Sequence, residues 1–478
     1  MATASPARTT ALHLLGSQRR RGARARDLMR GAREMETLGR KGRALATRLV
    51  LGVNVASGEL DRRIDSFAAR PGSIEPRVRD ALRLSAFEIL YLDTPRQVAV
   101  SQGVELVRGV SPRASRMANA VLRRIADCRP EVDEAREAVS AVAGGARREL
   151  SAEELSLASG YPVWLCARLV EALGVQRAAA MCACALEPAP VYVTCGKGDA
   201  MALEEKLVAA GLEPVAAELD GCWRLNAGAG LARSGLVASC DAVVADLAAQ
   251  LVCRATAAPG RVLEVGQGRG TKSLILARLM RELGVEPEVV GCELVGSKAR
   301  LSTKRMEEAE LAANVRCVEF DGTKLADEDA LPEALAGLFD SVIVDAPCSG
   351  TGTMRRHPET AWALGERIVD PAAEDGLPAL QLSLLTAAAS RVAPGGSLVY
   401  ATCSVLPEEN SQVVEAFLAS ESGAAFERAN LREAPAVAAN ESAAELIRAN
   451  VTPAGDFQSA PTQAGFDGHY FTRLVRTA

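Results

Sequence analysis

The C-terminal half of the chain alternates short apolar runs with helical stretches, and this alternation limits the folds open to it. Short runs rich in Val and Ile suit buried parallel strands, and the helices between them supply the crossovers. We therefore predict an α/β domain with a doubly wound parallel sheet. Residues 465–471 are expected to add a terminal strand. The other predicted strands are Arg261–Val265, Val289–Glu293, Val315–Phe320, Phe339–Asp345 and Ser397–Ala401.

The N-terminal part has a different period. Over residues 79–92, apolar side chains recur at i, i+3 and i+4 with charges between them, and Pro95 ends this helix. Similar patterns over 97–109 and 115–126 predict an all-helical bundle at residues 1–143. Linker helices and a small α/β subdomain are expected over 144–237, with the sheet domain over 238–478.

Charge is distributed unevenly along the chain. Residues 1–129 carry 25 Lys and Arg against 12 Asp and Glu, a balance of +13, whereas the rest carries 30 against 48, a balance of −18. A basic module joined to an acidic one suggests that the first part binds a polyanion. A helical domain with solvated arginine faces explains the charge alone equally well.

Cysteine usage and hydropathy restrict the environment of the chain. Its 478 residues include 12 Cys but no Cys-x-x-Cys pair, which argues against a zinc site or a disulfide framework. No apolar run approaches the roughly 20 residues of a membrane span. We therefore expect a cytoplasmic protein with no bound metal and no membrane contact.

A glycine-rich turn follows the first predicted strand. Gly266, Gly268 and Gly270 alternate with other residues just before a helix opens at Thr271. Glycines let the backbone approach a ligand closely, and the start of a helix offers free N–H groups. The spacing is not the Gly-x-Gly-x-x-Gly pattern of dinucleotide sites.

Acidic residues occur in or just beyond four consecutive strands, starting with Glu264 in the first. Ligands of open α/β sheets bind beyond the carboxyl ends of the strands, so these acids are expected to share one crevice. Glu293 could take both ribose hydroxyls, Asp321 an adenine edge, and Asp345 a methionine ammonium group. Such a site fits S-adenosylmethionine better than a nicotinamide.

Two cysteines stand in polar turns after predicted strands. Cys348 follows the strand that ends at Asp345, and Cys403 follows the strand 397–401. Free cysteines are most often inert core residues. Ser, Thr and Gly follow Cys348 where a core strand would stay apolar, so both thiols are predicted to face the crevice.

These motifs resemble a known family. Residues 345–359 are similar to the Pro-Cys motif, and residues 400–410 to the Thr-Cys motif, of the nucleolar-protein/Sun family of RNA methyltransferases. Residues 79–84, 87–90 and 118–125 resemble the NusB antitermination fold, which binds RNA and precedes the methyltransferase domain in one bacterial branch of that family.

The resemblance implies an S-adenosyl-L-methionine-dependent methyltransferase that modifies carbon 5 of cytosine in small-subunit ribosomal RNA. Cys403 would be the nucleophile that adds to carbon 6, Cys348 would assist product release, and Asp345 would touch both cofactor and base. We expect a monomer. The implied cofactor-binding residues are Gly266, Gln267, Gly268, Arg269, Gly270, Thr271, Lys272, Glu293, Asp321 and Asp345.

The chain departs from the family at two places. Residues 264–273 replace most of the usual Asp-x-Cys-Ala-Ala-Pro-Gly-Gly-Lys-Thr, although Gly270 and Lys272 keep their positions. Thr194-Cys195-Gly196 stands where the family has an Arg-x-Asn element, which removes one expected RNA contact. The following loop offers Arg355, Arg356 and His357 as candidates to hold phosphates beside the target base.

Two other functions remain open on the sequence. A NusB-like RNA-binding scaffold with a catalytically impaired cofactor turn would not bind S-adenosylmethionine. A nucleotide-dependent oxidoreductase would use Cys348 and Cys403 as a redox pair, but the chain lacks the dinucleotide glycine spacing.

Overall fold

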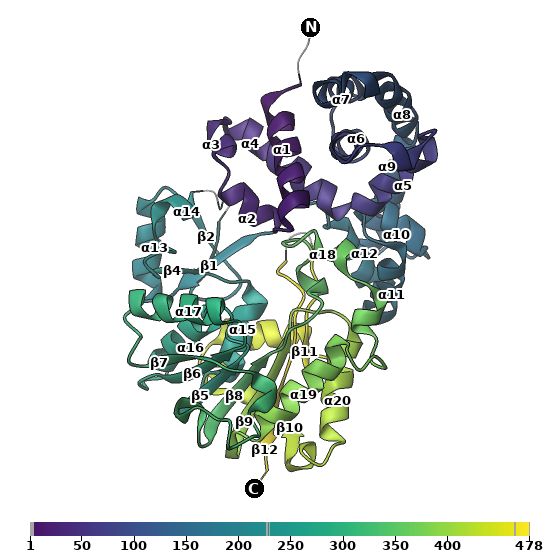
Figure 1. Cartoon of the computed structure of the whole chain (residues 1–478). Helices are drawn as coiled ribbons and strands as arrows, with labels where there is room; N and C mark the ends of the chain where they lie inside the picture. Colours follow the sequence, from purple (N-terminus) through teal and green to yellow (C-terminus); the bar gives the residue numbers. More distant parts are fainter. Residues whose placement is uncertain (1–3, 226–227, 229, 463–464, 478) are drawn as a thin grey trace. The chain divides into compact units, whose positions relative to one another are not determined.

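The computed structural model describes residues 4–225, 228, 230–462 and 465–477. Its contacts divide the chain into two compact units. The helical unit contains the described residues of 1–188, 353–365 and 461–463, and the sheet unit contains the remainder. An all-helical front followed by an α/β unit confirms the predicted fold class (Figure 1).

Helix α6 forms the centre of the helical unit. It packs against α1, α4, α5, α7 and α8, and Leu82 and Leu90 are fully buried. Pro76 occupies its first turn, where the missing N–H costs nothing. The principal helices are α1 (Pro6–Arg21), α2 (Ala25–Arg30), α3 (Arg33–Thr37), α4 (Arg40–Val55), α5 (Ser57–Phe67), α6 (Pro76–Tyr91), α7 (Arg96–Val110), α8 (Ser115–Asp127), α9 (Arg129–Ala143), α10 (Ala152–Ser159), α11 (Val163–Leu173) and α12 (Val175–Ala183).

Residues 353–365 belong to the helical unit although they follow the Pro-Cys turn in sequence. The Trp362 indole N–H, from the short helix α18 (Thr360–Ala363), donates to the carbonyls of Val55 at 2.6 Å and Gly160 at 3.0 Å. A Cβ at Gly58 would lie 2.0 Å from the Trp362 ring. Glycine at position 58 therefore makes room for the indole.

A small antiparallel sheet begins the sheet unit. Its strand order is β2-β3-β1-β4, and the helices α13 (Ala200–Ala209) and α14 (Leu231–Ser234) accompany it. The small sheet extends beyond the bounds 144–237 that were predicted for a small α/β subdomain, because β4 lies after residue 237. The strands are β1 (Val191–Cys195), β2 (Pro214–Ala216), β3 (Cys222–Leu225) and β4 (Ala242–Val244).

The main sheet has the order β10-β12-β9-β8-β5-β6-β7, with β11 beside β12. Strands β9, β8, β5, β6 and β7 run parallel, as predicted. The terminal strand β12 pairs antiparallel with β9, β10 and β11, so this edge of the sheet is mixed, and its direction was not predicted. The strands are β5 (Arg261–Val265), β6 (Glu288–Glu293), β7 (Val315–Glu319), β8 (Phe339–Asp345), β9 (Val392–Thr402), β10 (Phe426–Arg428), β11 (Phe457–Gln458) and β12 (Tyr470–Arg476).

The terminal strand β12 begins at Tyr470, so it overlaps the predicted segment 465–471 only at its last two residues and extends beyond it. Residues 470–475 pair with β9, and Tyr470, Phe471, Thr472 and Leu474 are buried, while the glycines at 465 and 468 precede the strand. Glycine weakens a strand interior, so the apolar run after the glycines forms the strand.

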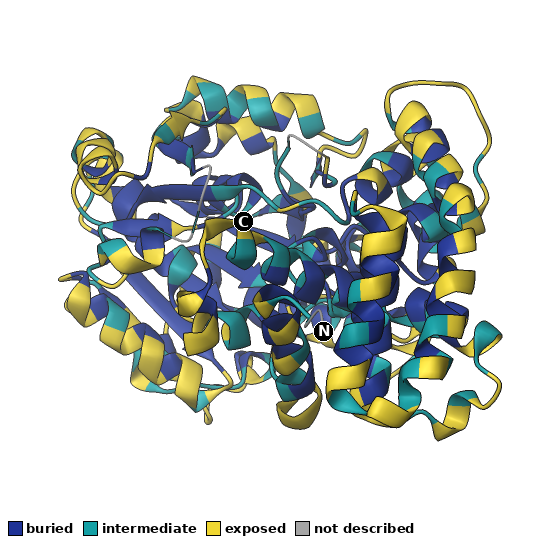
Figure 2. Cartoon of the chain, turned by 90° about the horizontal axis from the view of Figure 1, so that it is seen from above, coloured by how far each residue is buried: buried dark blue, intermediate teal, exposed yellow. Residues whose placement is uncertain are grey.

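Successive residues of the parallel strands face two separate apolar cores, as the period of two in a strand requires. Val262 and Ile343 join the core beneath α15 (Leu247–Thr256) and α16 (Thr271–Glu282), together with α21 (Pro435–Ala438) and α22 (Glu441–Asn450). Leu263 and Val342 join the core beneath α19 (Leu377–Ala389) and α20 (Ser411–Leu418). The strands are accordingly buried on both faces (Figure 2).

Among the helices that the structure describes, none combines the length and the apolarity that a bilayer crossing requires.

We expect Gly52→Ala to destabilise the helical unit. An added Cβ would lie 1.9 Å from the Phe87 ring, which is buried and stacked on Tyr91 with centroids 5.3 Å apart. Overpacking of this kind costs about 2 kcal/mol. Urea denaturation of the full chain measures the loss. Gly72→Ala is the matched control because its Cβ would meet nothing within 4 Å; equal stability of the two variants would contradict the prediction.

Candidate active site

The structure brings the two predicted cysteines into contact. Cys348 follows β8, and Cys403 comes directly after β9; these neighbouring parallel strands pair Asp345 with Ala401 near their carboxyl ends. The two Sγ atoms lie 3.2 Å apart, and both residues are half-buried. The Gly352 N–H donates to the Cys403 carbonyl at 2.9 Å and ties the two loops together.

The environment distinguishes the two thiols. The hydrogen bond with Cys348 lowers the pKa of Cys403, against the effect of burial, and Lys272 adds to the lowering. The same hydrogen bond, followed by burial, raises the pKa of Cys348 well above its usual value. The pKa shifts thus favour the thiolate form at Cys403 over Cys348, and the thiolate is the nucleophilic form of a cysteine.

A buried ion pair lies next to the cysteines. The Lys272 ammonium group is 2.5 Å from Asp345 Oδ2, and the two side chains are 16% and 33% exposed. Burial lowers the pKa of Lys272, but the charge of Asp345, its hydrogen bond and the neighbouring Cys253 and Glu264 together outweigh burial, so the net pKa is raised. Lys272 therefore stays charged, and it fixes the Asp345 carboxylate at the end of β8.

The glycine-rich turn connects β5 to α16. Gly266, Gly268 and Gly270 have φ values of 83°, 60° and 73°, which L-residues with a Cβ adopt only under strain. A Cβ at Gly266 would lie 2.5 Å from the Asp345 carbonyl oxygen. At Gly268, by contrast, an added Cβ would meet nothing closer than the Gly266 oxygen at 4.0 Å, so the turn is open on that side.

Glu293 is attached to this turn. Its carboxylate accepts the Gly268 N–H at 2.8 Å and the Val295 N–H at 2.8 Å, and the residue is 7% exposed. The predicted acid thus meets the predicted turn at the end of β6. Each carboxylate oxygen keeps acceptor capacity, because it has more than one lone pair.

Gln267 points into the protein instead. Its amide Nε2 donates to Ser273 Oγ at 2.8 Å, the residue is 3% exposed, and its main-chain N–H donates to the Cys292 carbonyl. Gly291 leaves room for this side chain, since a Cβ there would lie 2.2 Å from it. These bonds argue against the predicted cofactor contact from Gln267.

Glu264 lies beneath the turn and is fully buried. The Ser273 hydroxyl donates to its Oε2 at 2.5 Å. Burial raises the pKa of Glu264 to about 7, against the lowering by Ser273 and Lys272. The carboxyl is therefore part of an internal network and not of the exposed turn surface.

The remaining predicted cofactor residues occupy the same edge of the sheet. The Arg305 guanidinium donates to the Arg269 carbonyl at 2.7 Å and to Thr271 Oγ1 at 3.1 Å, which fixes the start of α16. Asp321 follows β7 and accepts the Thr323 N–H at 3.0 Å. Of the residues that the structure describes, no cluster of three or more His, Cys, Asp and Glu could hold a metal.

The prediction that Arg355 holds RNA phosphate was wrong. Its guanidinium donates to the carbonyls of Glu187, Pro188 and Thr462 at 2.8–3.2 Å, and the residue is 7% exposed. Buried main-chain carbonyls need hydrogen-bond donors, and a buried arginine can supply them. The spacing of residues in the sequence does not reveal such contacts.

His357 lies among cations of the helical unit. Burial, with smaller contributions from the charges of Arg24, Arg26 and Arg356, lowers its pKa to about 4. At neutral pH the imidazole is uncharged, so the positive charge of this cluster belongs to the arginines. The sequence indicated Arg356 and His357 but missed Arg24 and Arg26, which are distant in the chain.

The departure at Thr194 is also visible in the structure. Thr194 is buried in β1, and its hydroxyl donates to the Gly221 carbonyl at 2.9 Å. The side chain closes the small sheet and presents no cation to RNA.

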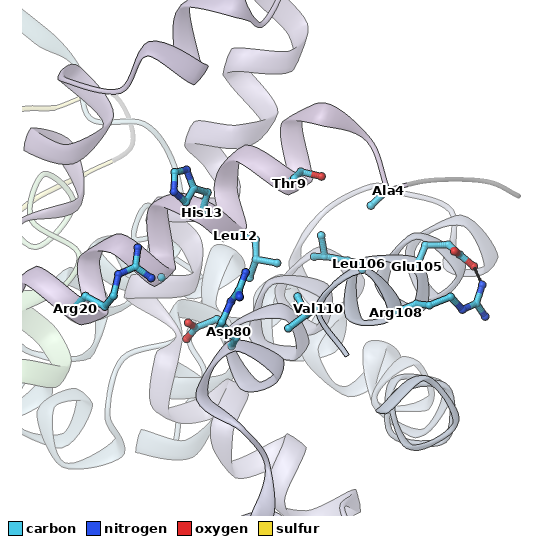
Figure 3. Close-up of a pocket in the computed structure, with 13 residues that line it drawn as sticks. Ala4, Thr9, Leu12, His13, Arg20, Asp80, Glu105, Leu106, Arg108 and Val110 are labelled. Carbon is cyan, nitrogen blue, oxygen red and sulfur yellow. Dashed lines mark hydrogen bonds and ion pairs between the residues drawn. The ribbon is translucent and has the colours of Figure 1, made fainter. Parts of the chain in front are cut away.

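A cavity of about 600 Å³ in the helical unit lies between α1, α6 and α7 (Figure 3). Leu12, Leu106 and Val110 line it, and Glu105 pairs with Arg108 at 2.5 Å on its rim. None of its lining residues is a cysteine or a predicted cofactor residue.

Comparisons with known proteins agree with this geometry. The family model "16S rRNA methyltransferase RsmB/F" matches residues 255–475, and the NusB family model matches residues 5–127. Ribosomal RNA small subunit methyltransferase B of Thermus thermophilus is 31% identical over 457 residues, which cover 95% of this chain and 94% of that protein.

Two solved structures share the fold. PH0851 superposes with a TM-score of 0.71 at 19% identity, covering 99% of both chains. NSun6 from Pyrococcus horikoshii with SFG superposes with a TM-score of 0.53 at 14% identity, covering 67% of this chain and all of that one.

We expect Glu264→Gln to flatten the pH dependence of unfolding. The folded protein keeps the Glu264 proton up to about pH 7, whereas the unfolded chain releases it near the ordinary value of 4.5. The folded state binds more protons between these values, so stability falls as pH rises through them, by about 3 kcal/mol. Urea titrations from pH 4.5 to 7.5 measure this slope. The control is Glu307→Gln on α17 (Gly296–Glu308), and an unchanged slope in Glu264→Gln would contradict the assignment.

Proposed function

Because this chain belongs to the 16S rRNA methyltransferase RsmB/F family, we propose that it methylates carbon 5 of a cytosine in small-subunit ribosomal RNA. The observation that carries the proposal is the contact between Cys348 and Cys403, 3.2 Å apart at the sheet edge where the glycine-rich turn also ends. In this proposal residues 1–143 form the RNA-binding domain, residues 144–237 connect it to the next domain, and residues 238–478 form the methyltransferase domain. The protein acts as a monomer in the cytoplasm.

The residues at the sheet edge fit S-adenosylmethionine. The turn at Gly268 is open to a ligand, Glu293 retains acceptor capacity for ribose hydroxyls, and Asp321 stands at the next strand end. When bound, S-adenosylmethionine supplies an electrophilic methyl group. In this proposal the Asp345 carboxylate, which pairs with Lys272, holds both a ligand ammonium group and the base.

Cys403 starts the proposed reaction. Its thiolate forms a bond to carbon 6 of cytosine, and the electron pair of the C5–C6 double bond becomes available at carbon 5 to accept the methyl group. A base then removes the proton from carbon 5. The electron pair restores the double bond and expels the Cys403 thiolate. The hydrogen bond with Cys348 lowers the pKa of Cys403, which favours both attack and departure of its thiolate.

Cys348 has a different part in this scheme. Its raised pKa keeps it protonated, so it donates to Cys403 and stabilises the departing thiolate. The sulfur of Cys348 therefore assists release of the methylated product.

The proposed RNA contact in the helical unit is the arginine cluster around His357. Arg24, Arg26 and Arg356 bring positive charge together there, and Arg24 is exposed. Arginines bind phosphate well because the planar guanidinium donates several N–H groups.

We expect Cys403→Ala to abolish methyl transfer, since no other thiolate adjoins the site, while S-adenosylmethionine binding is retained. Bisulfite mapping of small-subunit ribosomal RNA, from cells complemented with this variant, locates the modified cytosine. Undiminished methylation by Cys403→Ala would refute the assignment of Cys403 as the nucleophile.

We expect Cys348→Ala to accumulate a covalent protein–RNA adduct that resists denaturant, because expulsion of the Cys403 thiolate is slowed.

We expect Arg24→Gln to weaken RNA binding by removing one phosphate contact. The slope of log affinity against log salt should fall by about 1. The comparison variant is Arg113→Gln, another exposed arginine of the helical unit. Equal slopes of log affinity against log salt for the two variants would contradict a phosphate contact at Arg24.

A further inference from the structure

Glu409 is a buried carboxylate between the two cysteine loops. It ends the short 3-10 helix Pro407–Glu409, beyond β9, and has no exposed surface. A buried carboxylate is costly unless donors satisfy it. The protein supplies four of them, and they come from three separate segments.

Each oxygen of Glu409 accepts two hydrogen bonds. Oε1 accepts from the Ser349 main-chain N–H at 2.7 Å and from Gln381 Nε2 at 3.1 Å. Oε2 accepts from Ser349 Oγ at 2.5 Å and from Ser404 Oγ at 2.5 Å. Gln381, on α19, also donates to the Pro347 carbonyl at 2.9 Å.

These donors connect the carboxylate to both reacting loops. Ser349 directly follows Cys348, and Ser404 directly follows Cys403. Thr351 Oγ1 lies 3.0 Å from Ser404 Oγ and accepts the Val405 N–H at 3.1 Å, which adds further links between the loops. Glu409 therefore binds both Ser349 and Ser404, the residues that directly follow the two cysteines.

The negative charge of Glu409 disfavours the thiolate form of both cysteines. The pKa of Cys348 is raised mainly by its hydrogen bond with Cys403 and by burial, and Glu409 adds to the increase. The same charge opposes the lowered pKa of Cys403. A carboxylate at this position does not activate the nucleophile, so its value to the site lies in geometry.

We propose that Glu409 is a positioning residue that aligns the Cys348 and Cys403 loops so that their sulfurs meet. A carboxylate suits this task because it accepts hydrogen bonds from every side and donates none. An amide of the same size would turn an NH₂ group toward Ser349 and Ser404, whose hydroxyls would have to rotate and give up their bonds to it. This substitution would therefore weaken the hydrogen bonds that join the two loops, without changing the volume of the side chain.

The catalytic meaning of this alignment rests on the proposed function, but the alignment itself can be measured without it. A monosubstituted trivalent arsenical, phenylarsine oxide, bridges two thiols that lie close together. The full-length protein is titrated with it, and Cys403→Ala defines the signal of this pair.

The variant Glu409→Gln is compared with Glu415→Gln, an exposed position on the following helix α20. We expect the bridging rate of Glu409→Gln to fall on the order of tenfold, as for the loss of an aligned buried hydrogen bond, while Glu415→Gln matches the wild type. Methyl transfer should lose a similar factor in kcat with little change in KM for S-adenosylmethionine. Wild-type bridging in a folded Glu409→Gln protein would overturn the proposal.

A second variant covers the case in which Glu409→Gln fails to fold. Ser404→Ala keeps Glu409 and its bonds to Ser349, but removes the bond from the Cys403 loop to Glu409 together with the contacts of the Ser404 hydroxyl with Ser349, Thr351 and the Leu406 N–H. This variant should also slow bridging, and a wild-type rate there would overturn the proposal. If bridging responds as expected but the wild-type protein methylates no RNA, the alignment stands and the proposed function fails.

Discussion

The parallel pairing of β8 with β9 is the constraint on which the site depends. Parallel neighbours end at the same edge of the sheet, so the turns after Asp345 and Thr402 must leave it side by side. Cys348 and Cys403 are separated by 55 positions in the chain, yet their sulfurs are 3.2 Å apart. Any rearrangement of strand order would separate them.

The polar groups at this edge are held by hydrogen bonds and ion pairs with one another. Lys272 fixes Asp345, Glu293 holds the turn at Gly268, and Glu409 spans the two cysteine loops. Partly buried pairs interact strongly because the surroundings screen them less than water does. The site is consequently organised before any ligand arrives, which lowers the cost of binding and of reaching the transition state.

Much of this organisation was readable from the sequence. The bounds predicted for β5 and β8 agree with the structure, because Val/Ile runs that are buried on both faces have a strong local signature. The terminal strand lay later than expected, and its antiparallel direction depends on a return of the chain that no local pattern encodes. Arg355 failed as an RNA contact because three distant carbonyls use its guanidinium.

The sequence by itself determined the class of fold, the presence of a basic helical front, and the placement of Cys348, Cys403 and the acids near strand ends. These features follow from periodicity and strand polarity, which are local properties. Only the tertiary structure decided which cysteine has the lowered pKa, that Gln267 turns inward, and that Glu409 holds both loops. Those outcomes depend on burial and on hydrogen-bond partners from distant segments, and both exist only once the chain has packed.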